Sequence, residues 1–223
     1  MMLNMSKKMV YFFDLDGTLV DSSKCHASAF EEVLAIHYPD ICKTFNYDHF
    51  KGKSTPSVFK ELGITNPKKI AFFVNEKRRI YLDYINNGKI SIFSGALRLL
   101  RILKNNKKKN YIVTSASRNA TLKVLEVSRL ITLVDDIITS EDAKRNKPDP
   151  DIYFVAIEKC NMPVKDIVVV EDSLAGEIAA NKAGIDVIMV NQSKAVGTGL
   201  CFNTLNELHL YINKEFKVKY DKE

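Results

Sequence analysis

Tryptophan is absent from this chain of 223 residues, and so is any apolar run of the length that a membrane-spanning helix needs, about 20 residues. We therefore expect no membrane segment. Residues 1–9 are too short and too polar for a secretory signal peptide, and Met5 and Met9 are alternative start sites. The four cysteines show neither close pairing nor the spacing of a metal site, which predicts free thiols in a reducing cytoplasm. They are Cys25, Cys42, Cys160 and Cys201.

Acidic residues are slightly fewer than basic ones. The chain has 27 Asp and Glu residues and 33 Lys and Arg residues, which gives a net charge of +6. The densest basic cluster, Lys104–Lys109, holds no aromatic residues of the kind that stack on single-stranded bases. Lysines at the end of a predicted helix also suit the helix dipole and solvent. We interpret the excess charge as a solvated surface. We expect no nucleic-acid partner and a monomer or dimer.

Short apolar runs alternate with helical patterns along most of the chain. The runs are continuous rather than alternately polar, as a parallel sheet covered on both faces requires. They lie at 9–13, 111–113, 167–170 and 187–190, with shorter candidates at 137–138 and 201–202. Helical spacing occurs at 96–103, 120–130, 152–157 and 174–183. The alternation predicts an α/β fold with a Rossmann-like, doubly wound parallel sheet.

Residues 24–87 interrupt this alternation with helical patterns and no convincing strand. Segments 27–37 and 67–86 each predict a helix, and Pro67 suits the first turn of the second. We therefore expect a small helical cap domain at 24–87, inserted into a core formed by 1–23 and 88–223. The Gly197-Thr198-Gly199 segment indicates a loop and is too short for a phosphate-binding fingerprint.

Two carboxylates, Asp14 and Asp16, directly follow the first predicted strand. Ligands of open α/β sheets bind at the carboxyl ends of the strands. One Asp in this place also fits a helix cap or a turn. Two acids at the end of a buried strand need a metal ion, a partner or solvent to offset their desolvation. The segment therefore predicts a metal or phosphate site.

Polar residues also follow the next two predicted strands. The segment 114–117 (TSAS) opens a helix, where its hydroxyl and amide groups either hold an anion or simply cap the helix. Glu171 and Asp172 follow the strand at 167–170. Magnesium favours one or two carboxylates together with substrate phosphate and water. Asp14, Asp172 and the backbone carbonyl of Asp16 form a suitable set.

A lysine, Lys147, lies in the segment NKPDP, whose prolines fix a rigid, non-helical approach to the following helix. Such a lysine can neutralise a phosphoryl group. The ordered set DLDGT, TSAS, KPDP and VVVEDSLAG resembles the haloacid dehalogenase superfamily of phosphohydrolases, from about residue 10 to 208. The resemblance implies the superfamily's sheet core with a helical cap, and a magnesium-dependent enzyme.

The resemblance also implies roles for the acids. Asp14 is the expected nucleophile, which forms an aspartyl-phosphate, and Asp16 is the expected general acid and base. Asp172 is expected to hold Mg²⁺ with Asp14 and Asp16, and Glu171 is expected as a further ligand or as a residue behind the ligands.

The same resemblance assigns the phosphate-binding groups. Ser115 and the Ala116 amide are expected to bind the transferring phosphate. Thr114 is a neighbouring candidate, because the register of this motif shifts by one residue between subfamilies. Lys147 is expected to offset charge around the nucleophile and the phosphoryl group.

The cap is similar to that of the beta-phosphoglucomutase-like group. This similarity implies that His26, Lys53 and Lys77 contact the substrate or couple cap closure to acid/base action. For His26, simple packing against the hinge is the alternative. Beta-phosphoglucomutase has an arginine where this chain has Thr55, and a mutase needs a firm grip on a second phosphate. We therefore favour a phosphatase acting on a small phosphorylated metabolite, a sugar or polyol phosphate. A sugar-phosphate mutase and a non-catalytic, ligand-binding regulator are the alternatives.

Overall fold

The computed structural model describes residues 4–191 and 200–220, so the loop expected at Gly197-Thr198-Gly199 lies outside the described residues. Its main sheet has six parallel strands in the order β5-β4-β1-β6-β7-β8. The strands are β1 (Val10–Phe13), β4 (Lys109–Val113), β5 (Asp136–Ile138), β6 (Ile167–Glu171), β7 (Asp186–Met189) and β8 (Leu200–Cys201). The predicted α/β fold with a doubly wound parallel sheet is confirmed.

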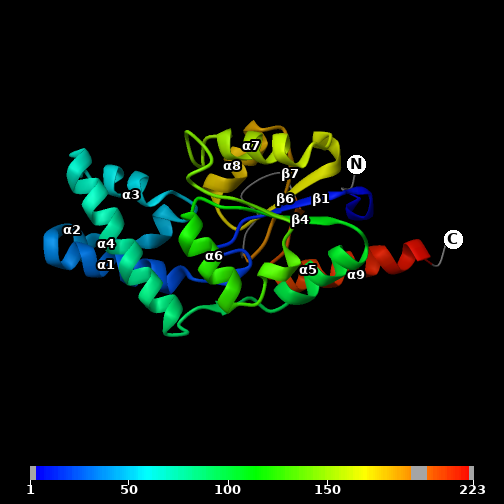
Figure 1. Ribbon diagram of the computed structural model, residues 1–223, viewed down its shortest axis with the longest axis horizontal. Helices are drawn as coiled ribbons and strands as arrows, with labels where there is room; N and C mark the ends of the chain where they lie inside the picture. Colours follow the sequence, from blue (N-terminus) through cyan, green and yellow to red (C-terminus); the bar gives the residue numbers. More distant parts are fainter. Residues whose placement is uncertain (1–3, 192–199, 221–223) are drawn as a thin grey trace.

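Strand β1 lies between β4 and β6, and all four of its side chains are buried. Tyr11 and Phe13 face one apolar cluster, whereas Val10 and Phe12 face another. This two-sided burial explains the continuous apolar runs in the sequence. Helices therefore cover both faces (Figure 1). One face carries α5 (Ala96–Asn105), α6 (Arg118–Val127) and α9 (Leu205–Tyr220), and the other carries α7 (Asp151–Cys160) and α8 (Leu174–Lys182).

Four helices follow one another between the two strands of a short ribbon, and they extend from one end of the sheet core (Figure 1). They are α1 (Ser23–His37), α2 (Pro39–Thr44), α3 (Thr55–Glu61) and α4 (Pro67–Asn86). The ribbon pairs β2 (Val20–Asp21) with β3 (Ser91–Ile92) in antiparallel fashion. The chain thus leaves and re-enters the core through one narrow connection.

Helix α4 begins where its sequence predicts. The Asn66 side chain accepts hydrogen bonds from the amides of Lys68 and Lys69, and Pro67 occupies the first turn. Its buried face repeats at helical spacing and contains one charged residue, Lys77, among Phe73, Ile80 and similar side chains. A lysine on a buried face requires a partner.

The sequence predicts the main strands and α1, α4, α5, α6, α7 and α8 to within a few residues. It does not predict α2, α3, α9 or the β2–β3 ribbon, because each is short or mixed in polarity. Short 3₁₀ turns occupy Met5–Lys7, Tyr47–Phe50, Ile131–Leu133 and Val164–Asp166.

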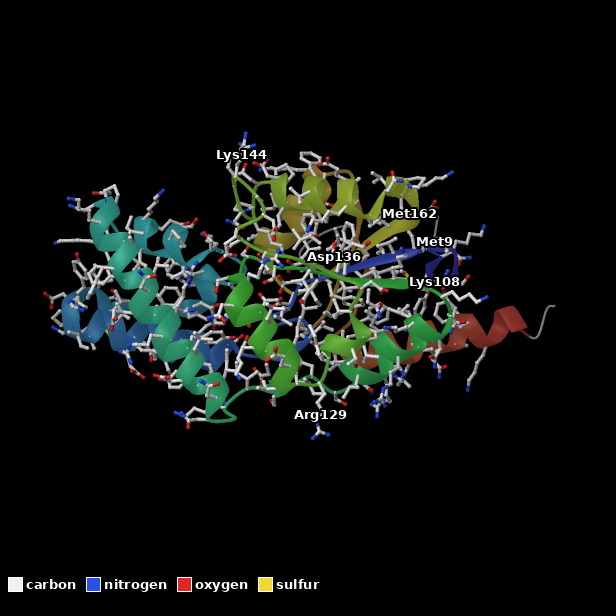
Figure 2. The ribbon with its side chains drawn as sticks, viewed as in Figure 1. Met9, Lys108, Arg129, Asp136, Lys144 and Met162 are labelled. Atoms are coloured by element: carbon white, nitrogen blue, oxygen red, sulfur yellow. The ribbon has the colours of Figure 1, made fainter. Side chains whose placement is uncertain are left out.

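Within the described ranges, no helix is both long and apolar enough to cross a membrane. The four cysteines are free. Exposed basic side chains such as Lys144 and Arg129 project from opposite sides of the molecule (Figure 2).

Candidate active site

The carboxyl ends of β1, β4 and β6 bring Asp14, Thr114 and Asp172 to one edge of the sheet. The Asp14 amide donates to the Val170 carbonyl at 3.0 Å, which continues the ladder one residue beyond β1. All three residues are buried. The edge therefore presents acids and a hydroxyl from rigid strands, as expected for a ligand site in an open α/β sheet.

Lys147 lies at the centre of this edge, with only 1% of its surface exposed. Its Nζ atom donates to Asp14 Oδ1 at 2.7 Å, to Glu171 Oε1 at 2.6 Å and to the Val113 carbonyl at 2.8 Å. Although burial alone lowers the pKa of Lys147, the two carboxylates outweigh it and raise this pKa well above its usual range. Lys147 is therefore a fixed positive charge beside Asp14.

Glu171 is a structural anchor for Lys147. Its Oε2 atom accepts from the amides of Asp172 and Ser173 at 2.9 Å each and from the Ser173 hydroxyl at 3.0 Å. Both carboxylate oxygens are thus engaged, which favours a place behind the metal ligands over direct ligation. Gly176 makes room for this carboxylate, since a Cβ there would lie 1.7 Å from Glu171 Oε1.

Asp172 completes a group of three buried acids, with Asp14 and Glu171, whose ligand atoms lie within 4.8 Å of one another. Its Oδ1 atom accepts from the Thr18 hydroxyl at 2.9 Å. Burial and the charge of Glu171 raise the pKa of Asp172 to about 7. Three clustered acids with one lysine favour a further cation, and an all-oxygen donor set suits Mg²⁺. The residues present therefore fit a magnesium ion.

Gly17 allows the chain to pass beside Asp172. Its φ angle is +92°, and a Cβ at this position would lie 2.2 Å from Asp172 Oδ2. The glycine of the DLDGT segment is thus required both by its backbone conformation and by its neighbour.

Asp16 accepts three hydrogen bonds or ion-pair contacts on one atom, Oδ1. The Ser22 hydroxyl lies at 2.6 Å, the Tyr81 hydroxyl at 2.8 Å and His26 Nε2 at 3.2 Å. Burial alone raises the pKa of Asp16, but these three groups outweigh it and hold the pKa well below its usual range. The other oxygen, Oδ2, makes no hydrogen bond to a described residue and is available for proton transfer.

His26 connects Asp16 to helix α4. Its ring stacks on Tyr81 at 4.0 Å between centroids, and its Nδ1 lies 2.6 Å from Lys77 Nζ. Burial and the charge of Lys77 lower the pKa of His26, so the ring is neutral at pH 7. A neutral ring with its proton on Nε2 donates to Asp16 and accepts from Lys77. Burial lowers the pKa of Lys77 to about 7.

The loop after β4 supplies the predicted phosphate-binding groups. Ser115 Oγ is buried without a hydrogen-bond partner, whereas Thr114 Oγ1 accepts from the Ala116 amide at 3.1 Å. Ser115 and Ala116 line the same cavity as Asp14 and Asp16. An unpartnered buried hydroxyl at the head of a helix is suited to binding an anion.

The loop that contains residues 51–55 also lines this cavity. Gly52 has a φ of +77° and packs so closely on the core that a Cβ would lie 2.1 Å from Ser173 Oγ. Lys53 and Thr55 line the cavity, although Lys53 Nζ also pairs with Glu61 at 2.6 Å. Seven of the predicted site residues therefore line one cavity: Asp14, Asp16, His26, Lys53, Lys77, Ser115 and Ala116. The other four, Thr114, Lys147, Glu171 and Asp172, are not among its lining residues.

Sequence reasoning missed four residues that hold this arrangement: Thr18, Ser22, Tyr81 and Gly176. Thr18, Ser22 and Gly176 lie inside or beside the recognised segments and could have been nominated by proximity. Tyr81 lies 65 positions from Asp16 and shares a helix face with Lys77, so only the helical period of α4 points to it.

Comparison with known proteins identifies the family. The sequence profile of the haloacid dehalogenase-like hydrolases matches residues 11–190. Hexitol phosphatase A of Escherichia coli is 30% identical over 192 residues, which cover 81% of this chain and 82% of that protein. Phosphorylated carbohydrates phosphatase of Thermotoga maritima is 26% identical, over 79% of this chain and 82% of that protein.

The fold agrees with solved structures. Beta-phosphoglucomutase from Clostridium difficile superposes with a TM-score of 0.80 at 22% identity, covering 97% of this chain and 100% of that one. At this identity the likeness concerns the fold. Together with the matched profile, it confirms the resemblance carried by the four sequence segments. The chain is an enzyme that belongs to the haloacid dehalogenase-like hydrolases.

Proposed function

We propose that this enzyme is a magnesium-dependent phosphatase that hydrolyses a small phosphomonoester through an aspartyl-phosphate on Asp14. The observation that carries the proposal is the environment of Asp14. Lys147 donates to Oδ1 of Asp14, whereas Oδ2 makes no hydrogen bond to a described residue, and Asp14 lines a cavity together with Asp16 and Ser115. A carboxylate nucleophile divides the hydrolysis into two easier displacements.

In the first displacement, Asp14 attacks phosphorus and the ester oxygen leaves. Asp16 is ionised beforehand because its pKa is low, so it takes up a proton from solvent as the ester enters and passes that proton from Oδ2 to the leaving oxygen, and the alcohol departs neutral. In the second, Asp16 takes a proton from water, whose oxygen attacks phosphorus and releases inorganic phosphate from Asp14. Ser115 and the Ala116 amide are the proposed partners of the phosphoryl oxygens. The amide, which here donates to Thr114 Oγ1 at 3.1 Å, exchanges that bond for one to the phosphoryl group.

Asp14, Asp172 and the backbone carbonyl of Asp16 are the proposed Mg²⁺ ligands, with Glu171 behind them. When bound, the ion neutralises charge on the transferring phosphoryl group. Lys147 contributes a second fixed charge at Asp14 Oδ1. Since carboxylates and phosphate repel one another, both cations serve to bring the nucleophile and the substrate together.

The proposed substrate is a sugar or polyol phosphate. Two similar proteins are named as phosphatases of hexitols and of phosphorylated carbohydrates, which supports this class. The proposed cap, residues 24–87, covers the substrate and controls water. We further propose a cytoplasmic enzyme, a monomer or dimer, that acts on a small phosphorylated metabolite rather than on nucleic acid.

Sugar-phosphate mutase activity is the second possibility, because the cap and the fold resemble beta-phosphoglucomutase. Thr55 and a Lys53 paired with Glu61 offer a weaker grip on a second phosphate than a free arginine. The non-catalytic regulator is disfavoured, because all the acids and Lys147 are present.

A panel of phosphomonoesters with Mg²⁺ tests the proposal, with inorganic phosphate as the readout. The panel includes hexose 1- and 6-phosphates, hexitol phosphates, phosphoglycolate and p-nitrophenyl phosphate. We expect phosphate release that stops on chelation of Mg²⁺. Isomerisation of a hexose 1-phosphate without net phosphate release would instead establish a mutase, and no turnover of any ester would refute both.

A further inference from the structure

Tyr47 is a residue of the catalytic cavity that the proposed mechanism does not yet use. It opens the 3₁₀ turn Tyr47–Phe50 and lines the same cavity as Asp14 and Asp16. The side chain is half-buried, and its hydroxyl makes no hydrogen bond to a described residue. A hydroxyl without a protein partner at the wall of a cavity is available to a bound molecule.

Two other rings hold the Tyr47 ring in place. Its centroid lies 5.8 Å from that of His26, with 27° between the two planes, and 5.8 Å from that of Phe30. His26 Nε2 in turn lies 3.2 Å from Asp16 Oδ1. Aromatic contacts of this kind favour defined ring orientations. The Tyr47 ring is therefore fixed one ring away from the Asp16 carboxylate.

The Tyr47 hydroxyl lies in the field of the catalytic acids. Burial raises the pKa of Tyr47 well above its usual range, and the charges of Asp16, Asp172 and Asp14 raise it further. Of these three acids Asp16 has the largest effect, as expected of the nearest carboxylate. The proton therefore stays on the phenol oxygen at neutral pH, and Tyr47 offers an uncharged O–H donor rather than an acid or a base.

We propose that the Tyr47 hydroxyl donates a hydrogen bond to the oxygen that leaves phosphorus in the first displacement, and to the water oxygen that takes its place in the second. This inference rests on the proposed phosphatase function and adds a catalytic residue to it. Asp16 must reach the same two oxygens, and Tyr47 lies beside it. An ester oxygen has two lone pairs, so one takes the proton from Asp16 and the other accepts from Tyr47. No proton leaves Tyr47 in either step.

The charge on the leaving oxygen decides how much this hydrogen bond contributes. Negative charge develops there as the bond to phosphorus breaks, and a donor already held in place lowers the barrier. An alkyl ester concentrates this charge on one oxygen, whereas 4-nitrophenolate spreads it over the ring and the nitro group. Loss of the donor should therefore slow an alkyl phosphate more than p-nitrophenyl phosphate.

Tyr47→Phe tests the inference, because it keeps the ring on His26 and Phe30 and removes only the hydroxyl. The substrates are p-nitrophenyl phosphate and the alkyl phosphate of the panel that the wild type hydrolyses fastest, with Mg²⁺ and the full chain. We compare kcat/KM, which covers the steps up to departure of the alcohol. We expect a fall of about tenfold for the alkyl ester and of less than about threefold for the aryl ester. The denaturation midpoint should be that of the wild type.

Tyr38→Phe is the matched control. Tyr38 also contacts a phenylalanine, with 5.5 Å between its ring centroid and that of Phe73, but it does not line the catalytic cavity. Its hydroxyl makes no hydrogen bond to a described residue either. Both kcat/KM values should stay at the wild-type level in this variant. Equal losses for the two esters in Tyr47→Phe, or no loss for the alkyl ester, overturn the inference and leave the phosphatase function in place.

Orthovanadate binding reads the same contact without turnover. In its five-coordinate form an apical oxygen stands for the leaving oxygen or the attacking water. With Mg²⁺, calorimetry should show vanadate affinity about tenfold lower in Tyr47→Phe than in the wild type or in Tyr38→Phe. That result supports the inference even if no ester of the panel is hydrolysed. Equal affinity in the three proteins, or no binding to any of them, refutes it.

Discussion

Gly176→Ala tests how Asp14 is positioned, although Gly176 touches neither Asp14 nor Lys147 in the contacts described above. The new Cβ would lie 1.7 Å from Glu171 Oε1, whereas real Cβ atoms essentially never approach closer than 3.0 Å, so the carboxylate must withdraw by roughly 1.3 Å. The Lys147–Glu171 contact of 2.6 Å then opens beyond hydrogen-bond distance. Breaking one partner from a buried ion pair costs about 3–5 kcal/mol when nothing replaces it.

We expect Gly176→Ala to lower kcat for any hydrolysed ester by about a hundredfold, since a displacement of about 1 Å at a catalytic constellation has that effect. The unfolding free energy should also fall by a few kcal/mol. Phosphate release with Mg²⁺ and chemical denaturation measure the two effects.

The matched control is Ala180→Gly on the same helix, which weakens α8 by about 1 kcal/mol without approaching Glu171. Its activity per folded molecule should be that of the wild type. The reasoning is refuted if Gly176→Ala keeps wild-type kcat, or if both variants lose activity only in proportion to their unfolded fraction.

Three further predictions concern the cations and the phosphate loop. Without Mg²⁺, raising the pH from 5 to 8 should lower the unfolding free energy through Asp172 by about 3 kcal/mol. Its pKa of about 7 lies above the ordinary 3.8, so over roughly two pH units the folded state holds a proton that the unfolded state has already released. Mg²⁺ should reverse that loss, so thermal denaturation with Mg²⁺ or chelator should show a larger Mg²⁺ effect at pH 8 than at pH 5, and an equal effect contradicts the assignment of Asp172. Ser115→Ala should lower kcat/KM about a hundredfold while leaving the unfolding free energy unchanged or higher by about 1 kcal/mol, since Oγ has no partner to lose. The control is Ser128→Ala, which removes a hydroxyl that donates to the Val124 carbonyl at 2.6 Å and should lower stability while leaving kcat/KM unchanged. A loss of stability in Ser115→Ala counts against the phosphate role. Lys147→Met leaves Asp14 and Glu171 buried and unpaired, so circular dichroism should show a stability loss of about 3–5 kcal/mol at pH 8, and wild-type stability in this variant would contradict the central position of Lys147.

The sheet could be predicted from the sequence because burial on both faces leaves a local pattern. Runs such as Ile167–Glu171 are continuous in apolar character up to their last residue, and acids follow where the sheet edge begins. The β2–β3 ribbon is two residues long on each strand, and its pairing joins positions about 70 residues apart. Nothing local in Val20–Asp21 distinguishes a strand from a turn. The strand forms because the chain returns beside it at Ser91–Ile92, after the four helices α1 to α4.

Some residues of the candidate site could likewise be predicted from local sequence, and others could not. Asp14, Asp16 and Asp172 are nominated by their place after strands, which is local information. That Lys147 is buried between two acids could not be predicted, because NKPDP reads as an exposed approach to a helix. The approach of Arg78 Nη2 to Glu141 Oε1, at 3.9 Å, could not be predicted either, since it depends on how closely α4 lies to the loop after β5.

The central claim is that Asp14 forms a covalent bond to the phosphoryl group. Rapid quenching of the enzyme with Mg²⁺ and a substrate labelled with ³²P, followed by proteolysis and peptide identification, measures this directly. The account predicts acid-stable label on the peptide that contains Asp14, formed and lost at rates consistent with turnover, and no label in Asp14→Asn. Label on a different residue, or undiminished phosphate release by Asp14→Asn, would contradict it.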